Sequence, residues 1–98
     1  MQFSGFDWDQ GNRAKCQKHG VSVETLERIF GRGLMILPDD AHSQTERRFR
    51  GIGYSDQGRA IFVVFTIRRP RGEVLIRPIS ARFMHKKEIQ HYEKTYRS

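Results

Sequence analysis

The chain has 98 residues, enough for one small hydrophobic core and too few for a second independent one, so we predict a single domain over residues 1–98. Lysine and arginine total 18 against 11 acidic residues, which gives a formal charge of +7 and favours encounter with nucleic acid, an acidic protein or an anionic membrane surface. Because Cys16 is the only cysteine, an intramolecular disulfide and a thiolate zinc site are excluded.

The sequence carries no signal for membrane insertion or export. No apolar stretch approaches the roughly 20 residues that span a bilayer. Residues 1–7 lack the basic start and the apolar segment of a signal peptide. We therefore expect a cytoplasmic protein without a membrane partner.

The N-terminal third predicts a short strand and two helices. Three aromatic residues alternate loosely with polar ones at the start of the chain: Phe3, Phe6 and Trp8. Asp9 is well placed to cap a helix over residues 10–18, which should end at Gly20. Ser22 begins a second helical pattern, which Gly31 should end. Its apolar side chains fall on one helical face and are Val23, Leu26, Ile29 and Phe30.

The middle of the chain predicts three strands, of which the last two form a hairpin. Residues 34–37 are a compact apolar run ended by Pro38, which is typical of a buried strand before a turn. Residues 46–54 and 59–69 are joined by a four-residue linker with the glycine expected of a hairpin loop. Residues 61–67 are continuously apolar, which predicts a central strand covered on both faces.

A further strand and a basic helix are predicted at the end of the chain. A turn at residues 70–72 leads into a strand over residues 73–81, in which Pro78 indicates an edge or a bulge because proline donates no ladder hydrogen bond. Residues 84–96 predict a helix whose packing side is Met84, Ile89, Tyr92 and Tyr96. This order predicts an α+β fold with two N-terminal helices, a mainly antiparallel sheet of four to five strands and a C-terminal helix.

Several short motifs resemble, in order and spacing, those of the BrnT family over nearly the whole chain. The main ones are Phe6-Asp-Trp-Asp9, Lys18-His-Gly-Val-Ser22, Glu46-x-Arg48-Phe49, Ile52-Gly53, Gly58-Arg59 and Arg77-x-Ile79-Ser-Ala-Arg82. BrnT proteins are toxins of a type II toxin–antitoxin system, with a RelE-like ribonuclease fold and a small cognate antitoxin called BrnA. Pro78 replaces a usual aliphatic residue, so the strand edge near Arg77 is expected to be reshaped.

The resemblance implies metal-independent cleavage of RNA that arrests translation. This chemistry needs a base for the 2′-hydroxyl, an acid for the leaving oxygen and cations for the charge of the phosphorane. Glu46 and Arg48 lie two apart on a predicted strand and so project to one face. Arg77 and Arg82 come from a second strand and its exit, where guanidinium groups suit a phosphodiester. His19 completes the expected catalytic group because an ordinary imidazole titrates at about pH 6.5.

Five further residues are expected to serve RNA binding or proton transfer. Lys18 would hold a phosphate, and His42 is a second candidate for proton transfer. Lys86 and Lys87 would contact the RNA backbone, and Trp8 would stack on a base.

Each of these assignments has a structural alternative. His19 and Lys18 can satisfy the last carbonyls of the preceding helix. Glu46 can form an ordinary cross-strand ion pair with Arg48 or Arg82. The tryptophan can anchor the core, and the two lysines of the last helix can form a solvated face.

A metal site is not expected. His42 shares a turn with Asp39 and Asp40, but three close residues in a turn do not define a coordination sphere. His19 and His85 are not at a recognised ligand spacing. We therefore predict no metal and no other cofactor.

The predicted partners are RNA and an antitoxin. The resemblance implies a BrnA-like antitoxin, an assembly of two toxins with two antitoxins, and contact with operator DNA only through the antitoxin. The antitoxin should present an acidic segment to the basic face, since complementary potentials favour capture. The alternative functions are a non-catalytic nucleic-acid-binding module or an inactive toxin remnant. A membrane contact by the last helix is a further reading, but its apolar face is too sparse for stable insertion.

Overall fold

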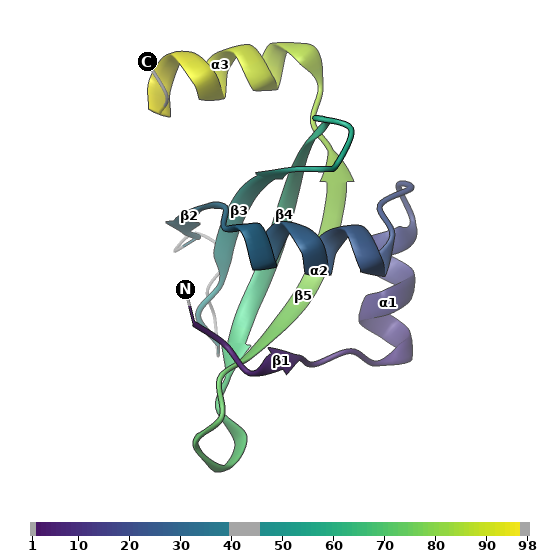
Figure 1. The fold of residues 1–98 in the computed structure, drawn as a ribbon, viewed down its shortest axis with the longest axis vertical. Coiled ribbons are helices and arrows are strands. Elements are labelled where there is room, and N and C mark those ends of the chain that lie inside the picture. Colours follow the sequence, from purple (N-terminus) through teal and green to yellow (C-terminus); the bar gives the residue numbers. More distant parts are fainter. Residues whose placement is uncertain (1, 40–45, 97–98) are drawn as a thin grey trace.

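A five-stranded sheet with helices α1 and α2 on one face forms the body of the molecule (Figure 1). The computed structural model describes residues 2–39 and 46–96. Within them the elements are β1 (Gly5–Phe6), α1 (Gln10–Gln17), α2 (Val23–Arg32), β2 (Met35–Pro38), β3 (Phe49–Tyr54), β4 (Ala60–Arg68), β5 (Leu75–Phe83) and α3 (Lys86–Tyr96). The strand order is β1-β5-β4-β3-β2, and all pairs are antiparallel except β1 with β5. The predicted α+β fold is confirmed.

Helix α1 begins at the predicted cap and is tied to the sheet. Asp9 Oδ1 accepts a hydrogen bond from Asn12 N at 2.8 Å, and Asn12 Oδ1 accepts one from Asp9 N at 2.7 Å, which together form a capping box. The Asn12 amide also donates to the carbonyl oxygens of Pro78 at 2.8 Å and Asp7 at 3.0 Å. One buried side chain therefore caps the helix and joins it to β5 and to the segment after β1.

Helix α2 begins at the predicted cap but ends later than predicted. Ser22 Oγ accepts a hydrogen bond from Thr25 N at 3.1 Å. The predicted end at Gly31 was wrong, because this glycine stays within the helix, which continues to Arg32. The positive φ that ends the helix belongs to Gly33 (φ 96°), whose N–H donates to Ile29 O.

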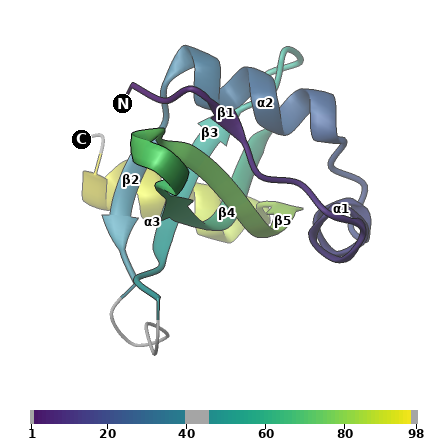
Figure 2. The same cartoon turned by 90° about the horizontal axis from the view of Figure 1, so that it is seen from below.

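The hydrophobic core lies between α1, α2 and one face of the sheet (Figure 2). It is built from fully buried side chains of β4 and of both helices, chiefly Ile61, Val63, Phe65, Leu26, Ile29 and Cys16. Phe30 packs edge-on against Phe65 with ring centroids 5.0 Å apart. Burial raises the pKa of the Cys16 thiol to about 11, so this cysteine behaves as a small apolar side chain.

Strand β4 is central as predicted, but the helices cover only one of its faces. Phe62 and Val64 project from the opposite face and are half-buried. We call this second side of the sheet the open face; by the strand register it also carries Arg50, Ile52 and Arg82. Helix α2 crosses the covered face, whereas α3 lies across the far end of the strands (Figure 1). The predicted cover on both faces was therefore wrong, because Phe62 and Ile52 of the open face line a hollow beneath α3.

Strand β5 begins and ends two residues later than predicted, so Arg82 lies within the strand. The turn before it is longer because a short 3₁₀ helix occupies residues 70–72 and Glu73 N donates to Pro70 O at 3.0 Å. Strand β3 also begins late, at Phe49, so Glu46 and Arg48 precede the strand on which they were predicted to lie.

A β-bulge in β5 decides which way its arginines project. Ser80 pairs with Val64 and Pro78 with Phe65, so Ile79 is an extra residue without a partner in β4. The predicted irregularity at Pro78 is thus confirmed as a bulge. Side chains alternate along a regular strand, so two residues five positions apart would project from opposite faces.

The extra residue reverses that alternation for the two arginines. Arg77 pairs with Thr66 and Arg82 with Phe62, and both partners belong to the open face. Both arginines therefore start from the open face.

Helix α3 packs partly as predicted. Tyr92 is buried, and Met84 and Ile89 are half-buried. The side chain of Tyr96 lies outside the described residues. In the described part of the chain, no helix has the length and apolar character of a membrane span.

Candidate functional site

Arg82 is held on the open face by a carboxylate from the first turn of α3. Its Nη1 and Nη2 each lie 2.7 Å from one oxygen of Glu88, in a bidentate pair. The hydrogen bonds from Arg82, followed by the one from His85 N, lower the pKa of Glu88 to about 2. The same pair raises the pKa of the guanidinium. Arg82 also lies over the Phe62 ring, with Cζ 4.9 Å from its centroid.

A small cleft joins Arg82 to the end of α1. We call it the Arg82 cleft; it has a volume of about 110 Å³. It is lined by His19, Phe62, Ser80, Ala81 and Arg82. His19 reaches it because α1 packs along β5 and the chain turns directly after the helix at Gly20 (φ 90°). Two of the predicted catalytic residues, His19 and Arg82, are therefore brought together.

Arg77 belongs to a different group at the β1 edge of the sheet. Its Nη2 lies 2.6 Å from Asp9 Oδ2, and its Nη1 lies 3.6 Å from Asp7 Oδ2. The hydrogen bond with Asp9 raises the pKa of the guanidinium. The pKa of Asp9 is lowered, chiefly by the hydrogen bond from Asn12 N and then by Arg77. This arginine thus sits among carboxylates.

Glu46 forms an ion pair with Arg68, whereas the sequence suggested Arg48 or Arg82 as its partner. Glu46 Oε2 lies 3.2 Å from Arg68 Nε, and Arg68 Nη1 lies 3.8 Å from Asp7 Oδ2. We call this connected group the Arg77 network; it comprises Asp7, Asp9, Glu46, Arg68 and Arg77. The pairing joins positions 22 residues apart, so no local spacing in the sequence indicates it.

The expected single catalytic group is therefore divided between two ends of β5. His19 and Arg82 share the cleft, whereas Glu46 and Arg77 share the network. Arg48 lies just before β3, half-buried, and its carbonyl accepts a hydrogen bond from Asp39 N at 2.9 Å.

The residues expected to bind RNA are also spread over the molecule. Lys18 is exposed beside His19, and Lys86 is exposed at the start of α3. Lys87 lines the hollow beneath α3. Trp8 packs on the core side, stacked on Phe6, and its Nε1 donates to Glu27 at 3.0 Å, which favours the core role. His42 lies outside the described residues, as does Asp40.

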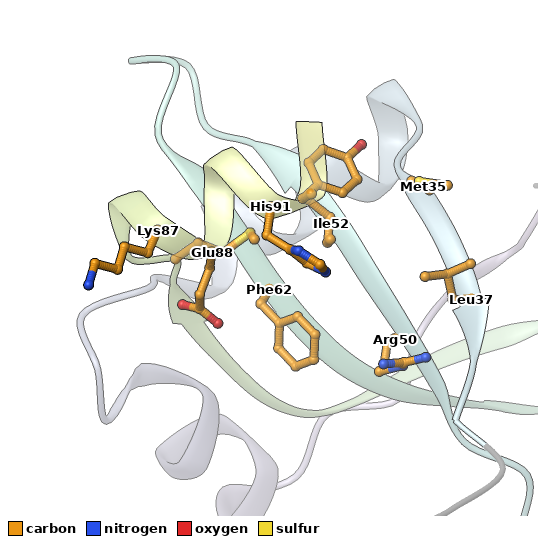
Figure 3. A pocket seen from close by; sticks show the side chains of 10 residues that line it. Met35, Leu37, Arg50, Ile52, Phe62, Lys87, Glu88 and His91 are labelled. Carbon is orange, nitrogen blue, oxygen red and sulfur yellow. The ribbon is translucent and has the colours of Figure 1, made fainter. Parts of the chain in front are cut away.

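Sequence reasoning missed a hollow beneath α3 that shares Phe62 with the Arg82 cleft (Figure 3). Its volume is about 390 Å³, and it is bounded by β2, β3, β4 and α3. Figure 3 shows Phe62 and His91 directed into it from opposite sides, with Glu88 at one margin and Arg50 at the other. We call it the α3 hollow. Its lining residues are Met35, Leu37, Arg50, Ile52, Phe62, Met84, Lys87, Glu88, His91 and Tyr92.

Metal ligands do not gather in the part of the chain that the structure describes. There, no three histidine, cysteine or acidic side chains lie close enough together to hold an ion.

Comparison with known proteins assigns the chain to a family. The model of the family described as "Ribonuclease toxin, BrnT, of type II toxin-antitoxin system" matches residues 8–88. A search of curated proteins gave no match. Since the family model covers most of the chain, the protein belongs to the BrnT ribonuclease toxins.

Proposed function

Starting from this membership, we propose that the chain cleaves RNA at the Arg82 cleft without a metal ion and thereby inhibits translation. The observation that supports the proposal is the shared cleft of His19 and Arg82, an imidazole beside a cation. Imidazole is the side chain that exchanges a proton near neutral pH, and a guanidinium fits a phosphate through two parallel hydrogen bonds.

The proposed reaction is an internal transfer within the RNA. His19 takes the proton of a 2′-hydroxyl, and the freed oxygen attacks the adjacent phosphorus. A new bond forms between O2′ and phosphorus as the bond from phosphorus to O5′ breaks, and O5′ takes a proton from solvent. The products are a 2′,3′-cyclic phosphate and a 5′-hydroxyl. Arg82 stabilises the negative charge that develops on the phosphorane oxygens.

Glu88 is proposed to position Arg82 for this role. With a pKa of about 2, its carboxylate stays ionised and makes a poor proton acceptor near neutral pH. Its two hydrogen bonds fix the plane of the guanidinium against Phe62. A phosphate would then approach the remaining N–H groups of Arg82.

The type II toxin class implies a cognate antitoxin. We propose that this partner is BrnA-like, that an acidic segment of it covers the basic residues of the open face, and that the complex holds two toxins and two antitoxins. Contact with operator DNA would be made by the antitoxin alone, and the complex would act in the cytoplasm. The charge of +7 supports this choice, because complementary potentials speed the capture of an acidic partner.

Cleavage of labelled RNA by the purified protein tests the proposal. Wild type should cleave in the presence of a chelator, and His19→Asn should slow cleavage by about 10²–10⁴-fold because it removes the proton acceptor. RNA binding should be retained by this variant. Binding without cleavage by wild type would favour the non-catalytic module, and activity restored only by a divalent ion would contradict the metal-independent mechanism.

A further inference from the structure

The α3 hollow is large enough to hold one flat ring. Its volume of about 390 Å³ falls near the lower end of small-molecule sites, roughly 300–1,000 Å³. Its floor is apolar and is formed by half-buried side chains of β3 and β4, Ile52 and Phe62. The Phe62 and His91 rings both point into the space from opposite sides (Figure 3). A planar group in this space could therefore stack on Phe62.

The hollow adjoins the Arg82 cleft. Phe62 lines both cavities, so its ring separates them. Glu88 lines the hollow and holds Arg82 by two hydrogen bonds of 2.7 Å. A nucleotide whose phosphate contacts Arg82 therefore has an apolar cavity beside it for its base. Proteins bind single-stranded RNA in this way, with bases stacked on aromatic side chains and the backbone held by cations.

Glu88 gives the hollow a hydrogen-bond acceptor. A carboxylate offers about four lone-pair positions. Two are used by Arg82, and one accepts the N–H of His85 at 2.8 Å. The remaining position can accept an N–H from a base. Adenine, guanine and cytosine carry an exocyclic amino group that can donate to this position. Uracil offers only its N3–H, which is flanked by two carbonyl oxygens that a carboxylate repels.

We propose that the α3 hollow is a nucleobase subsite, which takes the base next to the scissile phosphate by stacking on Phe62 and prefers amino-bearing bases to uracil through Glu88. This inference rests on the proposed ribonuclease function. The aliphatic lining would also accept an apolar side chain of a protein. The nucleobase is the occupant favoured by the adjoining Arg82 cleft and by the acceptor of Glu88, and an antitoxin segment is the competing outcome of the test.

The subsite can be tested by comparing how tightly the folded protein binds the nucleoside 3′-monophosphates of the four bases. Ribose 5-phosphate serves as the probe without a base. Affinities would be measured by ¹⁵N NMR titration. The adenine, guanine and cytosine nucleotides should bind about 5- to 150-fold more tightly than ribose 5-phosphate, the range for one stacked base. The uracil nucleotide should bind more weakly than these three. Equal affinity of all five probes for wild type would overturn the proposal.

A pair of matched variants locates the binding. Ile52→Trp fills the hollow and should remove the advantage of the three amino-bearing nucleotides. Ile89→Trp fills the neighbouring cavity on the other side of Met84 and should preserve it. Thermal unfolding followed by circular dichroism checks that both variants are folded. Unchanged nucleotide preference in Ile52→Trp would contradict the proposal, and loss of antitoxin binding alone would assign the hollow to the protein partner.

The two proposals fail in different ways. Preferential nucleotide binding without RNA cleavage would retain the subsite and reject the ribonuclease mechanism. Cleavage with no base preference at the nucleotide before the cut would retain the mechanism and reject the subsite. The position of the cut is read by sequencing the products of a mixed RNA pool.

Discussion

The two ends of β5 carry arginines on the same face but place them in opposite electrostatic surroundings. At the Arg77 end, two arginines meet three carboxylates in one connected group. At the Arg82 end, one arginine meets a single carboxylate, Glu88, and lies in a cleft with His19. The difference teaches that an arginine-rich strand is not uniformly suited to bind phosphate. The neighbouring charges differ between the two guanidinium groups, and this difference is the reason for proposing Arg82 as the phosphate ligand.

Replacing each arginine in turn should give the largest contrast between the two ends. Arg82→Ala should slow RNA cleavage by about 10²–10³-fold, because a cation aimed at the developing charge is lost. Arg77→Ala should slow it by less than about tenfold, because that guanidinium is already matched by carboxylates. Single-turnover cleavage of labelled RNA measures both. Equal losses would show that the two ends act as one site, and circular dichroism provides the folding control.

Asn12→Ala should reveal the structural role of the Arg77 end. The variant loses the side-chain half of the α1 capping box, the acceptor for Asp9 N, and leaves the buried carbonyl of Pro78 without its donor. A cost of about 2–3 kcal/mol in the free energy of unfolding is expected. Urea denaturation measures it. The matched control is Gln10→Ala at an exposed position of the same helix, which should change stability by less than about 0.5 kcal/mol.

Acidification should loosen the attachment of α3 at the Arg82 end. The pKa of Glu88 is lowered from 4.5 to about 2, so its pair with Arg82 stabilises the fold above pH 4.5. That stabilisation is lost as the pH falls from 4.5 through about 2. Amide hydrogen exchange of α3 should increase over this interval, by the equivalent of about 1 kcal/mol or less for a partly exposed pair. Glu88→Gln should abolish the pH dependence, and a variant that kept it would point to another carboxylate.

Glu46→Gln should have the smallest effect. Its pair with Arg68 is largely exposed, with side chains 46% and 41% accessible for the arginine and the glutamate. The free energy of unfolding should fall by less than about 1 kcal/mol, and less still at high salt. RNA cleavage should stay within about threefold of wild type, since the residue lies outside the cleft. Glu24→Gln on α2 removes the same charge elsewhere and serves as the control. A loss of cleavage as large as that of Arg82→Ala would return Glu46 to the catalytic group.

The order of elements could be predicted because it depends on local signals. Asp9 and Ser22 cap their helices as expected, and the apolar run of residues 61–67 occupies the centre of the sheet. The open second face could not be predicted from the sequence. An apolar strand residue gives the same sequence pattern whether it lines a hollow or is covered by a helix. Phe62 illustrates this ambiguity, because it is half-buried and lines the α3 hollow.

The sequence suggested some of the residues that lie together but not their ion-pair partners. His19 and Arg82 meet in one cleft, but Glu88 was assigned no role from the sequence. Neither helical nor strand periodicity relates Arg82 to Glu88, because six positions separate them across the end of a strand and the start of a helix. The pair of Glu46 with Arg68 depends in the same way on the registry of the sheet.

The extra residue Ile79 gives β5 a position at which the chain can be shortened. Deleting it would leave the pairs on either side as they are, Pro78 with Phe65 and Ser80 with Val64, so Arg77 and Arg82 would lie four positions apart on a regular strand and both would still start from the open face. The change would be confined to the local bend and twist that a bulge adds to its strand. A library of single-residue deletions along β5 should therefore retain toxicity best at Ile79.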